Sequence, residues 1–162
     1  MGLFSGETDE FWLDRGRILG HVGGSGFCRF MTQLDILHHR RSETAAEQKL
    51  GPYGITSLIS PGQTGAFTGY RVRIPAHQTT AVSYHKVSEE IYCVMSGRGT
   101  AILNGVAYAL EQGDFLRLPP GTTHGFVTEE EPLEMLDFHS PGSRPDHDVY
   151  FVGETPPGFV AR

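Results

Sequence analysis

Short apolar runs follow one another along the chain from Tyr53 onward, and glycine and proline separate them. Runs of this length that are bounded by turn formers are typical of β-strands. Because no segment between them is long enough for a crossover helix, the pattern predicts an all-β fold whose strands pair antiparallel in a sandwich or barrel. The expected strands span residues 53–60, 65–74, 79–85, 90–96, 98–104, 106–110, 114–118, 124–128 and 132–140.

Two local signals refine this pattern. Asn104 and Gly105 stand between two apolar runs, and this dipeptide predicts a two-residue hairpin turn. Before the strands, one short N-terminal helix is expected over Ser42–Gly51. Ser42 suits the N-cap, good helix formers follow it, and a Gly-Pro pair supplies the end.

The character of the sequence changes along the chain and divides it into four parts. Residues 1–30 are acidic and then glycine-rich, and we interpret them as a flexible or partner-contacting N-terminal arm. A lid or a strand exchanged with a partner subunit is the alternative. Residues 31–64 contain the short helix and a leading strand, and residues 65–140 form the barrel. Residues 141–162 are a Pro/Gly-rich C-terminal extension with one strand-like piece, Val149–Val152.

Composition limits the class of protein. The 162 residues are sufficient for one domain with one core. A net charge of -6 without a Lys/Arg cluster argues against nucleic acid or an anionic membrane as partner. Cys28 and Cys93 do not resemble a disulfide framework, no apolar run is long enough to cross a bilayer, and the first residues lack the features of a signal peptide. We therefore expect a cytoplasmic protein.

The segment Gly113–His124 carries the clearest candidate chemistry. A short strand is followed by a Pro-Pro-Gly turn, and His124 comes where the next strand begins. The turn fixes the position of this histidine. A histidine fixed at a strand end is suited to bind a metal or to transfer a proton.

Two further candidates lie upstream of this segment. His85 ends one expected strand and Glu90 begins the next. If the sheet closes into a barrel, His85, Glu90 and His124 can all point into its interior at one level. The alternative to an inward position for Glu90 is that it is a solvent-exposed carboxylate of the hairpin. Glu89 would suit that exposed position equally well.

The segment Gly113–His124 resembles the second motif of the cupin superfamily, Gly-x5-Pro-x-Gly-x2-His. Gly113, Pro119, Gly121 and His124 match it, and Thr128 stands where the family has its final Asn. The motif is specific. The resemblance covers roughly residues 65–140 and implies a jelly-roll β-barrel.

The upstream segment resembles the first cupin motif, His-x-His-x(3 or 4)-Glu-x6-Gly. Glu90 and Gly97 match it, His85 takes the second histidine position, and Ser83 replaces the first histidine. The segment is also similar to the cupin domain of mannose-phosphate isomerases, where His85 would be the first histidine and Val87 would replace the second. One histidine is missing in either alignment.

In cupins the motif histidines and glutamate bind a divalent metal inside the barrel. The resemblance therefore implies His85, Glu90 and His124 as metal ligands. Two histidines and a carboxylate with open coordination positions suit Fe, Mn, Ni, Co or Zn. We expect either a water molecule or another side chain to occupy the coordination position of the missing histidine. The side-chain candidates for that place are His77, Asp137 and His139.

Two of the remaining polar residues are candidates for acid/base catalysis. Tyr92 lies on the same face of its expected strand as Glu90, and His139 shares a face with Asp137 by two-residue alternation. Tyr92 and His139 are therefore the candidate catalytic groups. Arg71 and Arg73 alternate along another strand, where they either line a pocket for an anionic substrate or lie on an exposed edge.

The resemblance implies a metal-dependent enzyme that oxygenates, isomerises or cyclises a small polar organic substrate. Two alternatives belong to other classes: a metal-free cupin that binds a sugar or another small ligand, and a metal-free isomerase or epimerase with a histidine base. The expected partners are the small-molecule substrate and a second copy of the chain in a homodimer. Metal content separates the first hypothesis from the other two.

Overall fold

The structure, a computed structural model, separates into two units, Met1–Leu37 and His38–Arg162. In the first unit, strands β1 (Leu13–Asp14) and β2 (Arg17–Ile18) form an antiparallel pair. The predicted N-terminal arm otherwise lies outside the described residues and stays a prediction. The structure describes residues 13–14, 17–18, 37–38, 40, 46–63 and 66–160.

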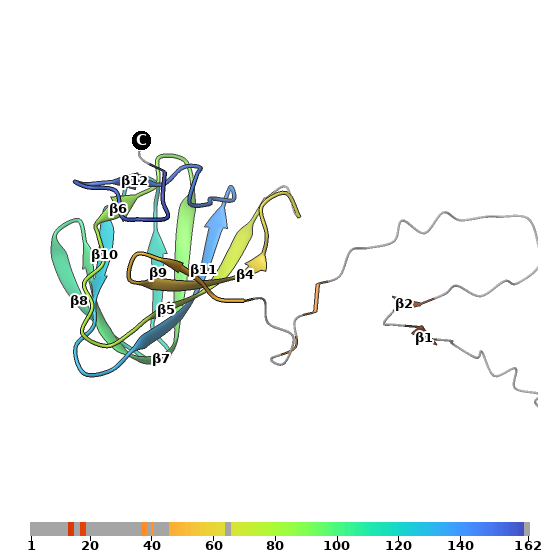
Figure 1. Ribbon diagram of the computed structural model, residues 1–162, viewed down its shortest axis with the longest axis horizontal. Coiled ribbons are helices and arrows are strands. Elements are labelled where there is room, and N and C mark those ends of the chain that lie inside the picture. Colours follow the sequence, from red (N-terminus) through yellow and green to blue (C-terminus); the bar gives the residue numbers. More distant parts are fainter. Residues whose placement is uncertain are drawn as a thin grey trace, which may run out of the picture. The chain divides into compact units, whose positions relative to one another are not determined.

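The second unit confirms the predicted all-β fold, since all regular elements of its described residues are strands (Figure 1). They pair antiparallel throughout. The described residues contain no helix with the length and apolar character that a membrane crossing requires. The strands are β3 (Gln48–Leu50), β4 (Tyr53–Ile59), β5 (Thr68–Ile74), β6 (Ser83–Tyr84), β7 (Glu89–Leu103), β8 (Val106–Glu111), β9 (Phe115–Leu118), β10 (His124–Val127), β11 (Leu133–Ser140) and β12 (Tyr150–Phe151).

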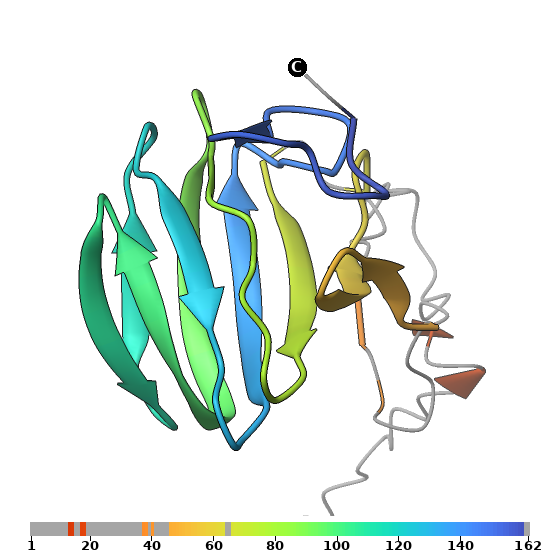
Figure 2. The same ribbon diagram turned by 60° about the vertical axis from the view of Figure 1, so that its left-hand side comes forward.

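The strands curl around a common interior in the order β12-β6-β10-β7-β11-β5-β4-β3, and β8 and β9 also pair with β7 (Figure 2). Strand β7 joins the two sides of the barrel. Its first half pairs with β11 and β9, and its second half pairs with β10 and β8. A strand that passes from one side to the other forms a corner of the barrel.

The corner in β7 corrects one sequence prediction. Separate strands were expected on either side of Gly97, but β7 is one strand of 15 residues. Gly97 has a positive φ of 80°, so it bends the strand without ending it. A Cβ atom at this position would lie 1.7 Å from the carbonyl oxygen of Pro132, which explains why the bend requires glycine.

The helix predicted over Ser42–Gly51 is wrong in its described part, because residues 48–50 form strand β3. Leu50 is 1% exposed and pairs with Tyr53 of β4 across a turn at Gly51. Burial and strand pairing override a local helix preference, which is a weak determinant on its own. Residues 42–45 of the expected helix lie outside the described residues.

Other local predictions have mixed outcomes. Asn104 and Gly105 have positive φ values of 49° and 80°, which confirms the predicted two-residue hairpin turn between β7 and β8. Arg71 and Arg73 are exposed on β5, which lies between β4 and β11. They therefore neither line the interior nor belong to an edge strand, and Arg73 lies 3.6 Å from Glu134 on the outer face.

The interior of the barrel has an apolar end and a polar end. Along β11 the inward side chains are Leu133, Met135, Asp137 and His139, in that order, and all are buried. The inward side chains of β11 thus change from apolar to polar along the strand. Because β7 runs antiparallel to β11, its inward side chains change from polar to apolar, from Glu90 to Val94. The hydrophobic core fills one end of the barrel, and a cluster of buried polar groups remains at the other.

Candidate metal centre

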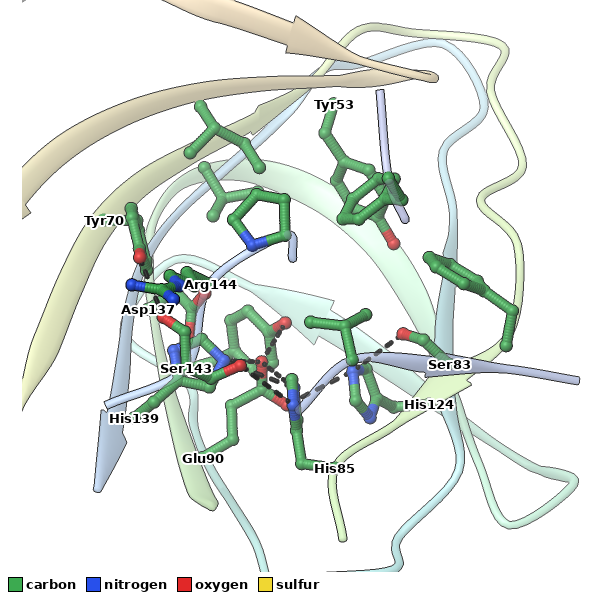
Figure 3. Close-up of a pocket in the computed structure, with 17 residues that line it drawn as sticks. Tyr53, Tyr70, Ser83, His85, Glu90, His124, Asp137, His139, Ser143 and Arg144 are labelled. Carbon is green, nitrogen blue, oxygen red and sulfur yellow. Dashed lines mark hydrogen bonds and ion pairs between the residues drawn. The ribbon is translucent and has the colours of Figure 1, made fainter. Parts of the chain in front are cut away.

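Three imidazole rings and one carboxylate converge at the polar end of the barrel (Figure 3). Glu90 Oε1 lies 3.0 Å from His139 Nε2 and 3.5 Å from His85 Nε2. The second oxygen, Oε2, lies 3.2 Å from His124 Nε2. All four residues are buried. The structure thus brings together His85, Glu90 and His124, which the sequence selected as ligands, and adds His139.

Strand pairing explains this arrangement. Glu90 is the second residue of β7, and the register places it directly opposite His139 of β11. His124 is the first residue of β10 and pairs with Ser83 of β6. His85 follows β6 directly. Strands β7, β10 and β11 and the position after β6 therefore contribute one inward side chain each at one level of the barrel.

The tightest group within this cluster consists of His85, Glu90 and His139. One ligand atom from each of the three residues lies within 4.8 Å of the other two. His124 is adjacent to this group through the second oxygen of Glu90, and its ring stacks on that of His85 with centroids 5.5 Å apart. Two imidazoles and a carboxylate form a ligand set that suits divalent transition metals.

The outer nitrogen of each histidine faces an oxygen atom. His85 Nδ1 lies 2.5 Å from the carbonyl oxygen of Asp148, and His124 Nδ1 lies 3.1 Å from that of Thr122. His139 Nδ1 lies 3.6 Å from Asp137 Oδ1, and both atoms are buried without a hydrogen-bond partner among the described residues, so only the rings of His85 and His124 are oriented by a hydrogen bond at Nδ1. A proton on Nδ1 leaves the lone pair of Nε2 directed at the centre of the cluster, which is the tautomer that a metal-binding histidine adopts.

The inner nitrogens then face one another and a carboxylate. His139 Nε2 lies 3.3 Å from His85 Nε2. Glu90 Oε2 is buried and has no hydrogen-bond partner among the described residues. Lone pairs and a negative charge in such proximity require a cation between them, either a proton or a metal ion. The residues present therefore fit a divalent metal.

Electrostatics favour the charged form of the carboxylate. Burial alone would raise the pKa of Glu90, but in the metal-free site the charges of protonated His124 and His139, and the hydrogen bonds from protonated His139 and His85, bring the pKa well below its usual range. Burial lowers the pKa of His85, yet the hydrogen bond and the charge of Glu90 outweigh burial and raise the pKa overall. Burial lowers the pKa of His124 below its usual value.

Residues 70–139 match the family model of the cupin domain. These residues comprise both motif segments and all four groups of the cluster. The chain carries a cupin domain.

Known proteins resemble this cupin over different lengths. An uncharacterised protein of Methanocaldococcus jannaschii is 35% identical over 51 residues, which are 32% of this chain and 41% of that protein. The nucleoside dehydratase Pac13 of Streptomyces has a TM-score of 0.61 at 20% identity, covering 76% of this chain and 99% of its own. The polyketide cyclase RemF of Streptomyces resistomycificus has a TM-score of 0.62 at 22% identity, covering 75% and 90%. At these identities the two structures establish the fold of the cupin barrel alone.

Tyr92 and Ser83 contact the cluster from inside the cupin barrel. The Tyr92 hydroxyl donates a hydrogen bond of 2.7 Å to Glu90 Oε1. Burial, and then the charge of Glu90, raise the pKa of Tyr92 well above its usual value, so the phenol keeps its proton and fixes the carboxylate. Ser83, which takes the place of the first motif histidine in one of the two alignments, has its Oγ 3.2 Å from His124 Nε2.

The three side chains considered for the missing ligand position have different surroundings. His139 belongs to the cluster. Asp137 is buried beside it, and burial raises the pKa of this carboxyl well above its usual value. His77 is exposed and lies 3.9 Å from Glu130. Two-residue alternation on the last barrel strand was the sequence signal for His139, but its place opposite Glu90 follows only from strand pairing.

A cavity of about 80 Å³ adjoins the cluster. Its polar floor contains the four residues of the cluster, and its walls are mainly apolar. Part of the wall comes from the C-terminal extension, a contribution that the sequence did not indicate. The wall residues from that extension are Ser143, Arg144, Pro145, Val149, Phe151 and Phe159.

Proposed function

We propose that this cupin is an enzyme that uses one divalent metal ion inside the barrel to act on a small organic substrate. The observation that carries the proposal is the orientation of three imidazole Nε2 atoms toward one buried carboxylate, with an oxygen facing each Nδ1. His85, Glu90 and His139 bind the ion in this proposal, and His124 is a further ligand. Iron, manganese, nickel, cobalt and zinc all suit these donors.

Such an ion supplies Lewis-acid chemistry, because it polarises a bound oxygen atom. The protein supplies the fixed geometry. Tyr92 keeps Glu90 Oε1 in place through its hydroxyl, and the backbone carbonyls of Thr122 and Asp148 orient two of the histidine rings. Fixed donors of this kind require little reorganisation during a reaction.

The cavity suggests the class of substrate. Its floor is polar, whereas Tyr53, Phe151 and Phe159 form an aromatic wall in which ring edges meet ring faces. A substrate with an oxygen-bearing end and a flat apolar body matches this division. The chemistry that we propose is oxygenation, isomerisation or cyclisation.

One observation favours a second candidate function, a metal-free isomerase or epimerase. Burial lowers the pKa of His124, so its ring is neutral near pH 7 and is able to accept a proton. The Ser83 hydroxyl beside His124 Nε2 would then orient this base. In this case the chain would work without a metal.

Metal analysis separates the two candidates. The purified protein is incubated with each of the five divalent metals and desalted, and its metal content is measured. About one equivalent should remain on the wild type, and Glu90→Ala should retain almost none. Glu89→Ala is the matched control, because this neighbour points outward to Arg117. If the wild type retains no metal, or if Glu90→Ala retains as much as the control, the metal-dependent function is refuted.

A further inference from the structure

Asp148 contacts the site from outside the barrel, although it belongs neither to the two motif segments nor to residues 70–139. It lies in the C-terminal extension, which crosses one end of the barrel before strand β12 (Figure 2). The residue is 5% exposed. Its charged side chain is therefore enclosed by the protein, and its contacts explain why.

The carboxylate of Asp148 accepts hydrogen bonds from consecutive backbone N–H groups of the loop after His85. Lys86 donates at 3.0 Å, Val87 at 3.1 Å and Ser88 at 2.8 Å. Charged acceptors form stronger hydrogen bonds than neutral ones. Without the carboxylate, the N–H groups of Lys86, Val87 and Ser88 would lose this partner, at a cost that is largest for the buried Ser88. Asp148 thus fixes the backbone that follows His85.

The main chain of the same residue fixes the ring of His85. The Asp148 carbonyl oxygen accepts a hydrogen bond from the N–H group at His85 Nδ1, at 2.5 Å. Side chain and main chain of Asp148 therefore act together on His85, one on its backbone and the other on its imidazole. With Nδ1 protonated, the lone pair of Nε2 points toward Glu90.

The backbone at Asp148 is adapted to this double contact. Its φ is 59°, in the left-handed region that few residue types other than glycine tolerate. Aspartate is one of the types that do. A conformation of this kind persists where the surrounding contacts determine it, and such positions cluster at functional sites.

The geometry points to Asp148 as the positioning residue of the metal site: it orients His85 and fixes its tautomer, so that the C-terminal extension is part of the site. This inference rests on the proposed metal-dependent function. It assigns a role to a residue some 60 positions away from the ligand that it orients.

Three variants test the inference. Asp148→Gly removes the carboxylate, retains the backbone carbonyl and accommodates the positive φ. Asp148→Asn keeps one acceptor oxygen in a residue type that also tolerates this conformation. Glu154→Gln changes an exposed acidic residue of the same extension and is the control. The readouts are the dissociation constant for cobalt(II) or zinc(II), and the tautomer of His85 from the nitrogen chemical shifts of its ring in the metal-free protein.

Asp148→Gly should raise the metal dissociation constant about 10- to 100-fold, the range typical of residues that orient a ligand. Asp148→Asn should fall between Asp148→Gly and the wild type, and Glu154→Gln should match the wild type. In the metal-free protein, His85 should carry its proton on Nδ1. Asp148→Gly retains the carbonyl, but without the carboxylate the loop after His85 is no longer held against it, so this variant should give a mixture of tautomers. A purely structural role would lower stability without changing either readout in the folded protein.

The two proposals fail differently. If the wild type binds no metal, the proposed function is wrong, and the His85 tautomer alone decides the role of Asp148. If folded Asp148→Gly keeps the wild-type tautomer, together with the wild-type dissociation constant where metal binds, the inference about Asp148 is overturned. If Asp148→Gly does not fold, the same measurements on Asp148→Asn decide, with a smaller shift expected.

Discussion

The two motif segments present their histidines to the same carboxylate but are fixed in different ways. In the second segment, a turn that ends at Gly121 precedes His124, and the carbonyl oxygen that faces the Nδ1 of His124 belongs to Thr122, two residues away. In the first segment, the ring of His85 is oriented by Asp148, 63 residues away. One histidine is positioned locally, and the other by the fold.

The same contrast extends to the glycines of the two motifs. A Cβ atom at Gly97 would collide with the backbone of Pro132, whereas a Cβ atom at Gly121 would have nothing within 4 Å. Both glycines have a positive φ. At Gly97 the constraint is therefore close packing against a remote part of the chain, whereas at Gly121 it is the backbone conformation of the glycine itself. Substitutions in the two segments should differ accordingly.

Gly97→Ala should have the largest effect. The new Cβ would lie 1.7 Å from the Pro132 carbonyl oxygen, so the backbone of β7 or of the segment just before β11 must move, in addition to the strain of a positive φ. We expect a loss of about 3 kcal/mol or more in the free energy of unfolding, or failure to fold. Urea denaturation and the yield of soluble protein measure this loss. A variant within about 1 kcal/mol of the wild type would contradict the described packing.

His139→Ala should have the next largest effect, because His139 of strand β11 is a ligand in the proposed metal site. We expect the metal dissociation constant to rise by more than about 100-fold, beyond the loss typical of residues that only orient ligands. His77→Asn is the control, since His77 is exposed and asparagine tolerates its positive φ of 59°. Isothermal titration with one metal compares the two. Equal affinities would remove His139 from the ligand set.

Gly121→Ala should have the smallest effect of the three. The space around a Cβ atom is open, so only the strain of a φ of 85° opposes the substitution. We expect a loss of about 1 kcal/mol in the free energy of unfolding and metal affinity close to that of the wild type. Urea denaturation of Gly121→Ala beside Gly97→Ala gives the difference directly. If Gly121→Ala loses more free energy of unfolding than Gly97→Ala, the contrast between the two segments is wrong.

The sequence predicted the architecture well where local signals determine it. Turn formers at the strand ends predicted most strands, and Asn104-Gly105 predicted the hairpin that the structure confirms. The prediction failed where tertiary contacts determine the secondary structure. Gly97 bends one long strand because Pro132 packs against it, and residues 48–50 form a strand because Leu50 is buried. Neither contact has a local signature.

In the candidate site, too, the residues with a local sequence signal were predicted and those that depend on tertiary contacts were not. The resemblance to the two cupin motifs implied His85, Glu90 and His124 as ligands, and the structure brings these three residues together. His139 was one of several candidates for a fourth ligand, because strand alternation shows which residues share a face but not which residue lies opposite Glu90. Asp148 gave no signal, since its bonds to the first segment exist only in the folded chain.

The central claim is that one divalent metal ion binds between the first segment and the strand opposite it. An anomalous difference map from crystals of the metal-loaded protein, recorded at the absorption edge of that metal, tests it most directly. The account predicts one peak inside the barrel, about 2.0–2.2 Å from the Nε2 atoms of His85 and His139 and from the carboxylate of Glu90. A map without a peak at this position, or with a peak at other side chains, would contradict it.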